Sequence, residues 1–200
     1  MPKALLWDFG NVIVRWDPRT LYAKIFPDPV ERDRFLAEVC TMAWHLETDR
    51  GLSFAENCAR LAADHPHHHD AIHAWRERWD EMFSGPIAET EAVIEDLHVR
   101  GVPQYGLSNI SHETLDSTLA MSPAFGRLAG VVASGLEGVI KPQPEIFHLV
   151  CERFGMAPGD FLFVDDSAKN IEAARALGFD VHHFTDPAAL RPALEARGLL

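Results

Sequence analysis

The chain has 200 residues, of which 47% are hydrophobic and 24% are charged, as is usual for a folded, water-soluble protein. Its formal net charge of −12 argues against nucleic acid as the main partner, and no apolar stretch approaches the roughly 20 residues that span a bilayer. The first residues lack the long apolar region of a secretion signal and the three cysteines form no CxxC pair, so we expect a reduced, cytoplasmic protein without a membrane partner.

The chain opens with a buried strand and continues into a long helical segment. The apolar run 4–9 carries one carboxylate, Asp8, near its end and predicts a buried strand. Residues 17–85 show only helical patterns, with helix starts at two Asp-Pro pairs and a capping box at Ser53 and Glu56. This interval is too long for a connecting loop, so we predict that 17–85 is a helical domain inserted after the first strand.

Strands and helices alternate along the rest of the chain. Further strands are predicted at 103–108, 128–134, 160–165 and 180–184. Helices are expected at 87–101, at 167–178 behind a capping Ser167, and after Pro187, with Pro192 shortening or bending the last one. This order predicts an α/β fold: a Rossmann-like, doubly wound parallel sheet of about five strands, formed by 1–16 and 86–200. Ligands of such sheets sit beyond the carboxyl ends of the strands, so the helical insertion would cover the site as a cap.

Four stretches place reactive side chains where a strand ends or a helix begins. They are Asp8, the pair Ser108-Asn109, Lys141 in "VIKPQPEIF", and the pair Asp165-Asp166. An aspartate can attack phosphorus and form an aspartyl-phosphate, which divides one difficult hydrolysis into two easier steps. Three carboxylates and one ammonium would repel a phosphate unless a divalent cation joined them, and Mg²⁺ prefers oxygen ligands. The pattern therefore indicates a magnesium-dependent phosphate site.

With these residues in this order, the chain resembles the haloacid dehalogenase-like (HAD) hydrolase superfamily over nearly its whole length. Most members of that superfamily are phosphatases. Asp8 matches the nucleophile motif, Ser108 the second motif, Lys141 the third and Asp165-Asp166 the acidic fourth, while the insertion resembles the family's cap.

The chemistry of these residues predicts the following roles. Mg²⁺ would be held by Asp8, by the backbone carbonyl of Gly10 and by Asp165, Asp166 or both. Lys141 would neutralise the nucleophile and the transferring group, and Ser108 would hold phosphoryl oxygens. Asn109, Lys141 and the cap residue His45 are expected to contact the substrate, and Asn109 and Asn170 are further candidates for positioning these groups.

Gly10 departs from the pattern of most phosphatases in the superfamily. They carry a second aspartate two residues after the nucleophile, which acts as general acid and base, and here that position is a glycine. General acid–base help contributes about 10²–10⁴ in rate, so its loss has to be made good. Either the leaving group needs little protonation, as in a sugar 1-phosphate, or a cap residue (His45, Asp49 or Asp17) supplies the proton, or the protein is not a phosphatase. The Asp-x-Gly-Asn form also occurs in a branch that resembles bacterial sugar-phosphate phosphatases.

We therefore predict a Mg²⁺-dependent hydrolase of a small phosphate monoester, with a sugar phosphate among the candidates. Two alternatives stay open: a metal-independent 2-haloacid dehalogenase, which would tolerate Gly10, and a phosphate-binding module without turnover.

Three features of the predicted cap lie outside these motifs. The aromatic stripe through Trp75 and Trp79 fits a hydrophobic core better than a ligand site. The segment 38–51 fits a substrate-facing loop or an ordinary helix connection equally well. The His-rich stretch 65–73 fits a solvated loop better than a metal site. The sequence does not indicate the oligomeric state.

Overall fold

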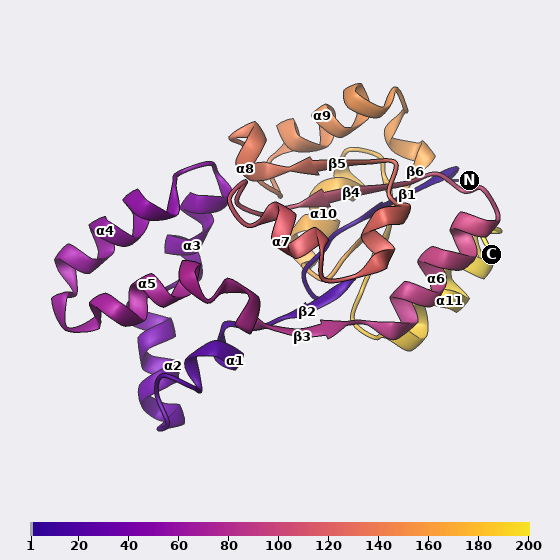
Figure 1. The fold of residues 1–200 in the computed structure, drawn as a ribbon. Helices are drawn as coiled ribbons and strands as arrows, with labels where there is room; N and C mark the ends of the chain where they lie inside the picture. The colour runs from indigo at the N-terminus through magenta and orange to yellow at the C-terminus, as the bar shows by residue number, and fades with distance from the viewer. Residues whose placement is uncertain (1) are drawn as a thin grey trace.

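The computed structural model describes residues 2–200 and contains a parallel sheet with helices on both faces, joined to a separate group of helices (Figure 1). The sheet has the strand order β5-β4-β1-β6-β7 and every neighbouring pair is parallel. Its strands are β1 (Ala4–Trp7), β4 (Gln104–Ser108), β5 (Gly130–Ala133), β6 (Phe161–Asp165) and β7 (Asp180–His183). The prediction of a doubly wound α/β fold with five strands is confirmed. Each strand in the structure is one to three residues shorter than the predicted range.

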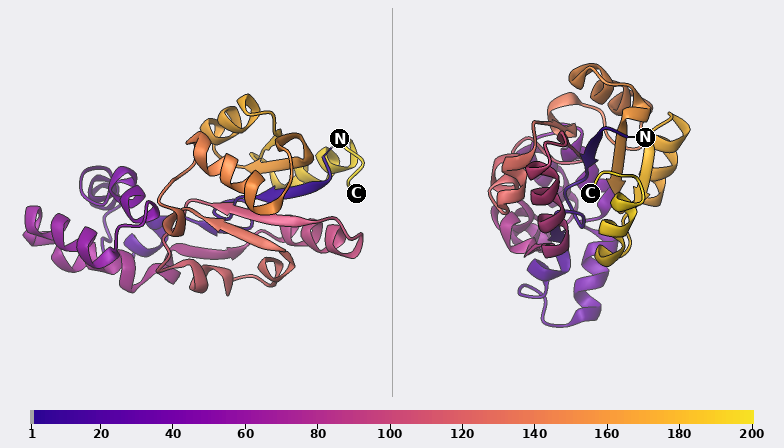
Figure 2. Two further views of the ribbon diagram at one scale, coloured as in Figure 1. Left: turned by 90° about the horizontal axis from the view of Figure 1, so that it is seen from above. Right: turned by 90° about the vertical axis from the view of Figure 1, so that its right-hand side faces the viewer.

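Helices cover both faces of the sheet (Figure 2). Alternate residues of the central strands β1 and β6 belong to the two separate hydrophobic clusters on these faces. Leu5 and Trp7 of β1 face α6 (Ala88–Val99) and α11 (Pro187–Glu195), whereas Ala4 and Leu6 face α9 (Pro144–Phe154) and α10 (Ala168–Ala176). All four side chains are completely buried, which explains why the strand reads as a continuous apolar run. Shorter elements complete this core: α7 (Leu115–Leu119), α8 (Ser134–Glu137) and the 3₁₀ turns Pro123–Arg127 and Pro158–Asp160.

The second group of helices, residues 18–82, has a hydrophobic core of its own and is called the cap below. It consists of α1 (Pro18–Tyr22), α2 (Pro29–Glu38), α3 (Met42–Asp49), α4 (Phe54–Asp64), α5 (His69–Glu77) and the 3₁₀ turns Pro66–His68 and Trp79–Met82. The predicted starts are confirmed, because Asp17, Asp28 and Ser53 each accept a backbone N–H of the helix they precede. Trp75 is completely buried in the cap's core, as the aromatic stripe predicted.

A two-stranded antiparallel ribbon joins the cap to the sheet, and the sequence did not predict it. Its strands are β2 (Val14–Trp16) and β3 (Phe83–Pro86), with Trp16 opposite Phe83. The expectation that 17–85 is helical throughout is therefore wrong at its end, where 83–85 are strand. The ribbon is only three and four residues long, too short for a period-two pattern to be visible.

Three smaller expectations can be compared with the structure. Ser167 precedes α10, but its side chain makes no capping hydrogen bond, and its backbone N–H donates to Asp165 Oδ1 at 2.8 Å. The last helix, which Pro192 was expected to shorten or bend, runs through that proline and ends at Glu195. Most of 38–51 is the regular helix α3 rather than a loop. Among residues 2–200, no helix combines the length and apolar character needed to cross a membrane.

Gly106 of β4 allows an aromatic ring to lie directly on the strand. A Cβ atom at this position would lie 2.6 Å from Cε1 of Phe9, whose ring is buried and packs edge-on against Phe125 at 4.8 Å. We predict that Gly106→Ala lowers the free energy of unfolding by about 1–3 kcal/mol because the ring cannot give way. Urea unfolding measures this.

Gly126→Ala is the matched control. A Cβ at Gly126 would meet nothing within 4 Å, so its stability should stay equal or rise by up to about 1 kcal/mol. Equal stability of the two variants would contradict the close approach of Phe9.

Candidate active site

The central strand β1 and its two neighbours bring three of the predicted residues to one edge of the sheet. Asp8 follows the last residue of β1, and its N–H donates to Val164 of β6 at 3.0 Å. Ser108 and Asp165 are the last residues of β4 and β6. Parallel strands end at the same edge, so residues far apart in the chain become neighbours. All three side chains are buried.

Lys141 lies between two of these carboxylates. Its Nζ is 2.8 Å from Asp8 Oδ1 and 2.7 Å from Asp165 Oδ2, and it donates to the Leu107 carbonyl at 3.0 Å. Asn109 holds the Lys141 backbone from both sides: its Nδ2 donates to the Lys141 carbonyl, and the Lys141 N–H donates to its Oδ1. Both polar atoms of Asn109 are thus engaged in positioning Lys141, and its predicted contact with substrate stays a prediction.

The two acidic residues of the fourth motif have different surroundings. Asp165 is completely buried and accepts hydrogen bonds from Ser167 N–H and from Asn170 Nδ2 in addition to Lys141. Asp166 is exposed beside the same cavity. Asp165 is therefore a group that orients its neighbours, while Asp166 keeps oxygens available for a ligand.

Burial and mutual repulsion perturb the ionisation of the site. Burial raises the pKa of Asp8 to about 7; Lys141 opposes this rise, while Asp165 and Asp166 add to it. Burial and Asp165 likewise raise the pKa of Asp166. Burial disfavours the charged form of Lys141, but the two facing carboxylates outweigh it and leave the pKa above its usual value. Lys141 is therefore an ammonium. Its single positive charge does not balance the three neighbouring carboxyl groups of Asp8, Asp165 and Asp166.

These residues fit a divalent cation. Asp8, Asp165 and Asp166 each offer an oxygen within 4.8 Å of the others, and among residues 2–200 no other group of three His, Cys, Asp or Glu side chains comes as close together. Their charge exceeds that of Lys141, and oxygen ligands suit Mg²⁺. The His-rich stretch 65–73 does not form such a group.

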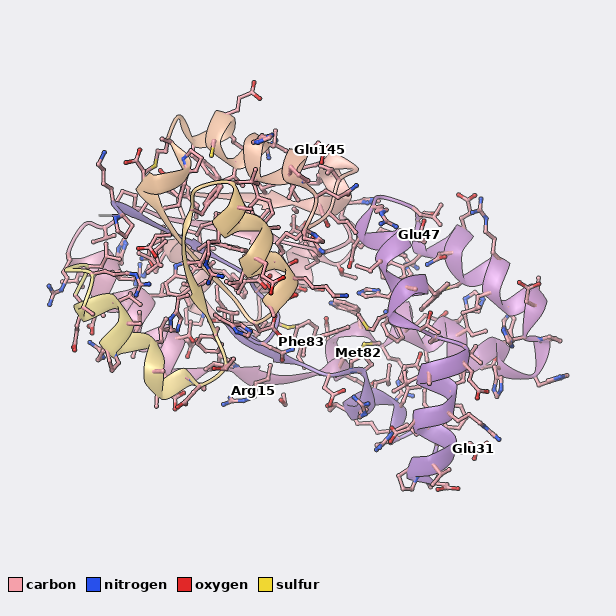
Figure 3. All side chains as sticks on the ribbon, turned by 180° about the vertical axis from the view of Figure 1, so that it is seen from behind. Arg15, Glu31, Glu47, Met82, Phe83 and Glu145 are labelled. Atoms are coloured by element: carbon pink, nitrogen blue, oxygen red, sulfur yellow. The ribbon has the colours of Figure 1, made fainter. Side chains whose placement is uncertain are left out.

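The cap closes this edge of the sheet over a cavity of about 220 Å³. Asp8, Ser108, Lys141, Asp166 and Asn170 line its floor. The cap and the ribbon contribute a mostly apolar roof: Trp16, Met42, Leu46, Trp79 and Phe83, with the polar His45 and Asp49 among them. Phe83 and Met82 lie where the cap and the core meet, whereas Glu31 lies at the far end of the cap (Figure 3). The predicted cap residue His45 is thus part of the cavity wall.

Asn11 and Trp16 also line the cavity, and the sequence did not predict them as site residues. Asn11 adopts a left-handed conformation with φ 57°, and its Oδ1 accepts the Trp16 N–H at 3.1 Å. Asparagine tolerates this conformation better than most residues. The Asn that directly follows Gly10 was the available signal for this turn.

The family is established by comparison with known proteins. Residues 2–178 match the family model of the haloacid dehalogenase-like hydrolases. The chain belongs to this family and is a hydrolase, as the four motifs predicted.

Individual relatives include phosphatases and dehalogenases. The chain is 25% identical over 198 residues to the sesquiterpene phosphatase astK of Aspergillus oryzae, covering 99% of this chain and 96% of that one. A HAD family enzyme of Bacteroides thetaiotaomicron, solved with magnesium and inorganic phosphate, matches with a TM-score of 0.70 at 22% identity over 95% of this chain and 99% of that one. The L-2-haloacid dehalogenase of Xanthobacter autotrophicus matches with a TM-score of 0.65 at 18% identity over 97% and 83%. These structures share the fold.

Magnesium binding gives a direct test of the acidic cluster. We predict that Mg²⁺ raises the melting temperature of the wild-type protein, since a ligand of the native state stabilises it by mass action, and that Asp166→Asn removes most of this increase. Thermal unfolding at increasing Mg²⁺ concentration measures both. Asp64→Asn removes the same charge at an exposed position of α4 and should keep the wild-type response. An Asp166→Asn protein that responds like the wild type would contradict this site.

Proposed function

We propose that the protein is a Mg²⁺-dependent phosphomonoesterase in which Asp8 is the nucleophile. The single observation that supports this most is the position of Lys141, which contacts Asp8 and Asp165 beside a third carboxylate, Asp166. This arrangement has a nucleophile, a fixed positive charge and oxygen ligands for a cation in one cavity.

Each residue has a defined task in this reaction. An oxygen of Asp8 forms the bond to phosphorus, and the ester P–O bond breaks. Lys141 and the backbone N–H groups near Ser108 stabilise the charge on the phosphoryl oxygens, and Asn109 keeps Lys141 in place. Asp8, Asp166 and the Gly10 carbonyl would hold Mg²⁺, with Asp165 beside them. When bound, the ion supplies positive charge that offsets the carboxylates and the phosphate.

The cavity roof favours an ester of an apolar alcohol over the sugar phosphate considered from the sequence. Five of the side chains above the catalytic floor are apolar or aromatic, and a sugar's hydroxyl groups would find few partners among them. The whole-length similarity to a sesquiterpene phosphatase agrees with this preference. We therefore propose a small phosphate monoester whose alcohol is mainly hydrocarbon.

The dehalogenase alternative has an electrostatic difficulty. A 2-haloacid carries a carboxylate into a cavity that already contains Asp8 and Asp166, and Lys141 already contacts two carboxylates. Release of halide from a 2-haloacid in the presence of EDTA would nevertheless establish it. Tight binding of phosphate esters without turnover would instead support the binding module.

Turnover of a phosphate ester tests the proposed function. We expect phosphate release from an ester panel with Mg²⁺, little release with EDTA, and background release from Asp8→Asn, which lacks the nucleophile. Intact-mass analysis after a rapid acid quench should detect a phosphorylated wild-type protein and no phosphorylated Asp8→Asn. Asp64→Asn serves as the control. Full activity of Asp8→Asn would rule out this mechanism.

Substrate preference tests the assignment of the roof. We predict a higher kcat/KM for an isoprenyl monophosphate than for glucose 1-phosphate, and a selective loss for the isoprenyl ester in Leu46→Asn. Replacing an apolar wall of a pocket lowers kcat/KM for an apolar substrate by about tenfold or more. Steady-state kinetics on both esters measure the two effects. Equal losses on both esters would show that Leu46 acts on the fold and not on the alcohol.

A further inference from the structure

The proposed reaction, on which this inference rests, leaves one task unassigned. A hydrocarbon alcohol is a poor leaving group, so its oxygen needs a proton as the ester bond breaks. Position 10, beside the nucleophile, is a glycine. The donor therefore has to come from elsewhere in the cavity wall.

Two of the three candidates are unsuited to this task. Asp17 lies outside the cavity, is about half exposed, and uses Oδ1 to accept the Arg19 N–H at the start of α1. His45 lines the cavity, but burial lowers the pKa of its imidazole and so favours the ring without the extra proton.

Asp49 has the placement of a proton donor. It lies in the last turn of α3, lines the same cavity as Asp8, and only 4% of its side chain is exposed. Its Oδ2 is 3.6 Å from His45 Nε2, and among residues 2–200 nothing hydrogen-bonds to its Oδ1. Buried polar atoms rarely lack a partner, so the carboxyl group of Asp49, a wall of this cavity, is not fully engaged within the protein.

The contacts of the cap with the core hold Asp49 over the site. Two residues after Asp49, the backbone of Gly51 turns with φ 101°, and a Cβ there would lie 3.2 Å from the Gly135 carbonyl of α8. Glu113 of the core accepts the Phe54 N–H at 2.7 Å and pairs with Arg76 of α5 at 3.0 Å. The segment that follows Asp49 thus lies against the core at Gly51 and is hydrogen-bonded to it at Phe54.

We propose that Asp49 is the general acid and base of this enzyme, supplied by the cap in place of a residue at position 10. In the first step Asp8 bonds to phosphorus, the electrons of the ester bond remain on the alcohol oxygen, and that oxygen takes the carboxyl proton of Asp49. In the second step the Asp49 carboxylate accepts a proton from water as the water oxygen bonds to phosphorus. Cleavage of the bond between phosphorus and the Asp8 oxygen then releases inorganic phosphate and restores both side chains.

The ionisation of Asp49 agrees with this role. Burial raises the pKa of its carboxyl group, and the charges of His45 and Lys141, together with the backbone N–H of Ser111, offset this only in part. The carboxyl group therefore keeps its proton at a higher pH than an exposed aspartate does.

A pair of substrates separates proton donation from a structural role. Asp49→Asn keeps the size of the side chain and loses the proton. We expect a fall of about 10²–10⁴ in kcat for an alkyl phosphate and little change in the phosphorylation step with 2,4-dinitrophenyl phosphate, whose leaving group needs no proton. Burst kinetics with 2,4-dinitrophenyl phosphate measure the phosphorylation step alone. A burst of wild-type rate in Asp49→Asn shows that the variant is folded. Glu47→Gln, an exposed position of α3, should behave as the wild type on both esters (Figure 3).

A second variant tests the same idea by rescue. A Cβ at Gly10 would have the Trp16 Cβ at 4.0 Å as its nearest neighbour, so a side chain can be accommodated. Gly10→Asp in the Asp49→Asn background should restore part of the alkyl phosphate turnover. An equal loss on both esters, or no loss on either, would overturn the proposal for Asp49. A wild-type protein that hydrolyses no ester would instead overturn the phosphatase function itself.

Discussion

The rest of the site depends on the ion pairs that the Lys141 ammonium makes with two carboxylates. Two buried carboxylates, Asp8 and Asp165, lie within 2.8 Å of it, and either would be strongly destabilised by burial without that charge. The surrounding hydrogen bonds serve mainly to keep these three groups in place: Asn109 holds the Lys141 backbone, while Asn170 and Ser167 saturate Asp165. Asp8, whose Oδ1 contacts Lys141 and the Phe9 N–H, also lines the cavity.

The fold and the floor of the site were largely predictable, for a local reason. A buried parallel strand leaves an uninterrupted apolar run in the sequence, and the residue that ends the run stands at the edge where ligands bind. Asp8, Ser108 and Asp165 could thus be located from their own neighbours in the chain. Lys141 was located by a different signal, since it precedes the helix that begins at Pro144, and the resemblance to a family motif added to this.

The cap side was less predictable because its contacts are tertiary. His45, Asp49 and Asp17 were equivalent candidates in the sequence, and only the packing of α3 against the core separates Asp49 from the exposed Asp17. The β2–β3 ribbon was missed because two short, sequence-distant segments stabilise each other and neither carries a pattern of its own. Ser167 has the residue type and position of a helix cap, yet its side chain makes no capping hydrogen bond.

The ribbon also restricts how the molecule can admit a substrate. The chain passes between core and cap twice, and the two passages are paired side by side, so they must bend together and resist twisting apart. Trp16 and Phe83, opposite each other in the ribbon, are also walls of the cavity. A bend of the ribbon therefore also moves these two aromatic surfaces against the rest of the cavity wall. Opening of the cavity and the position of its aromatic walls are therefore mechanically linked through the ribbon.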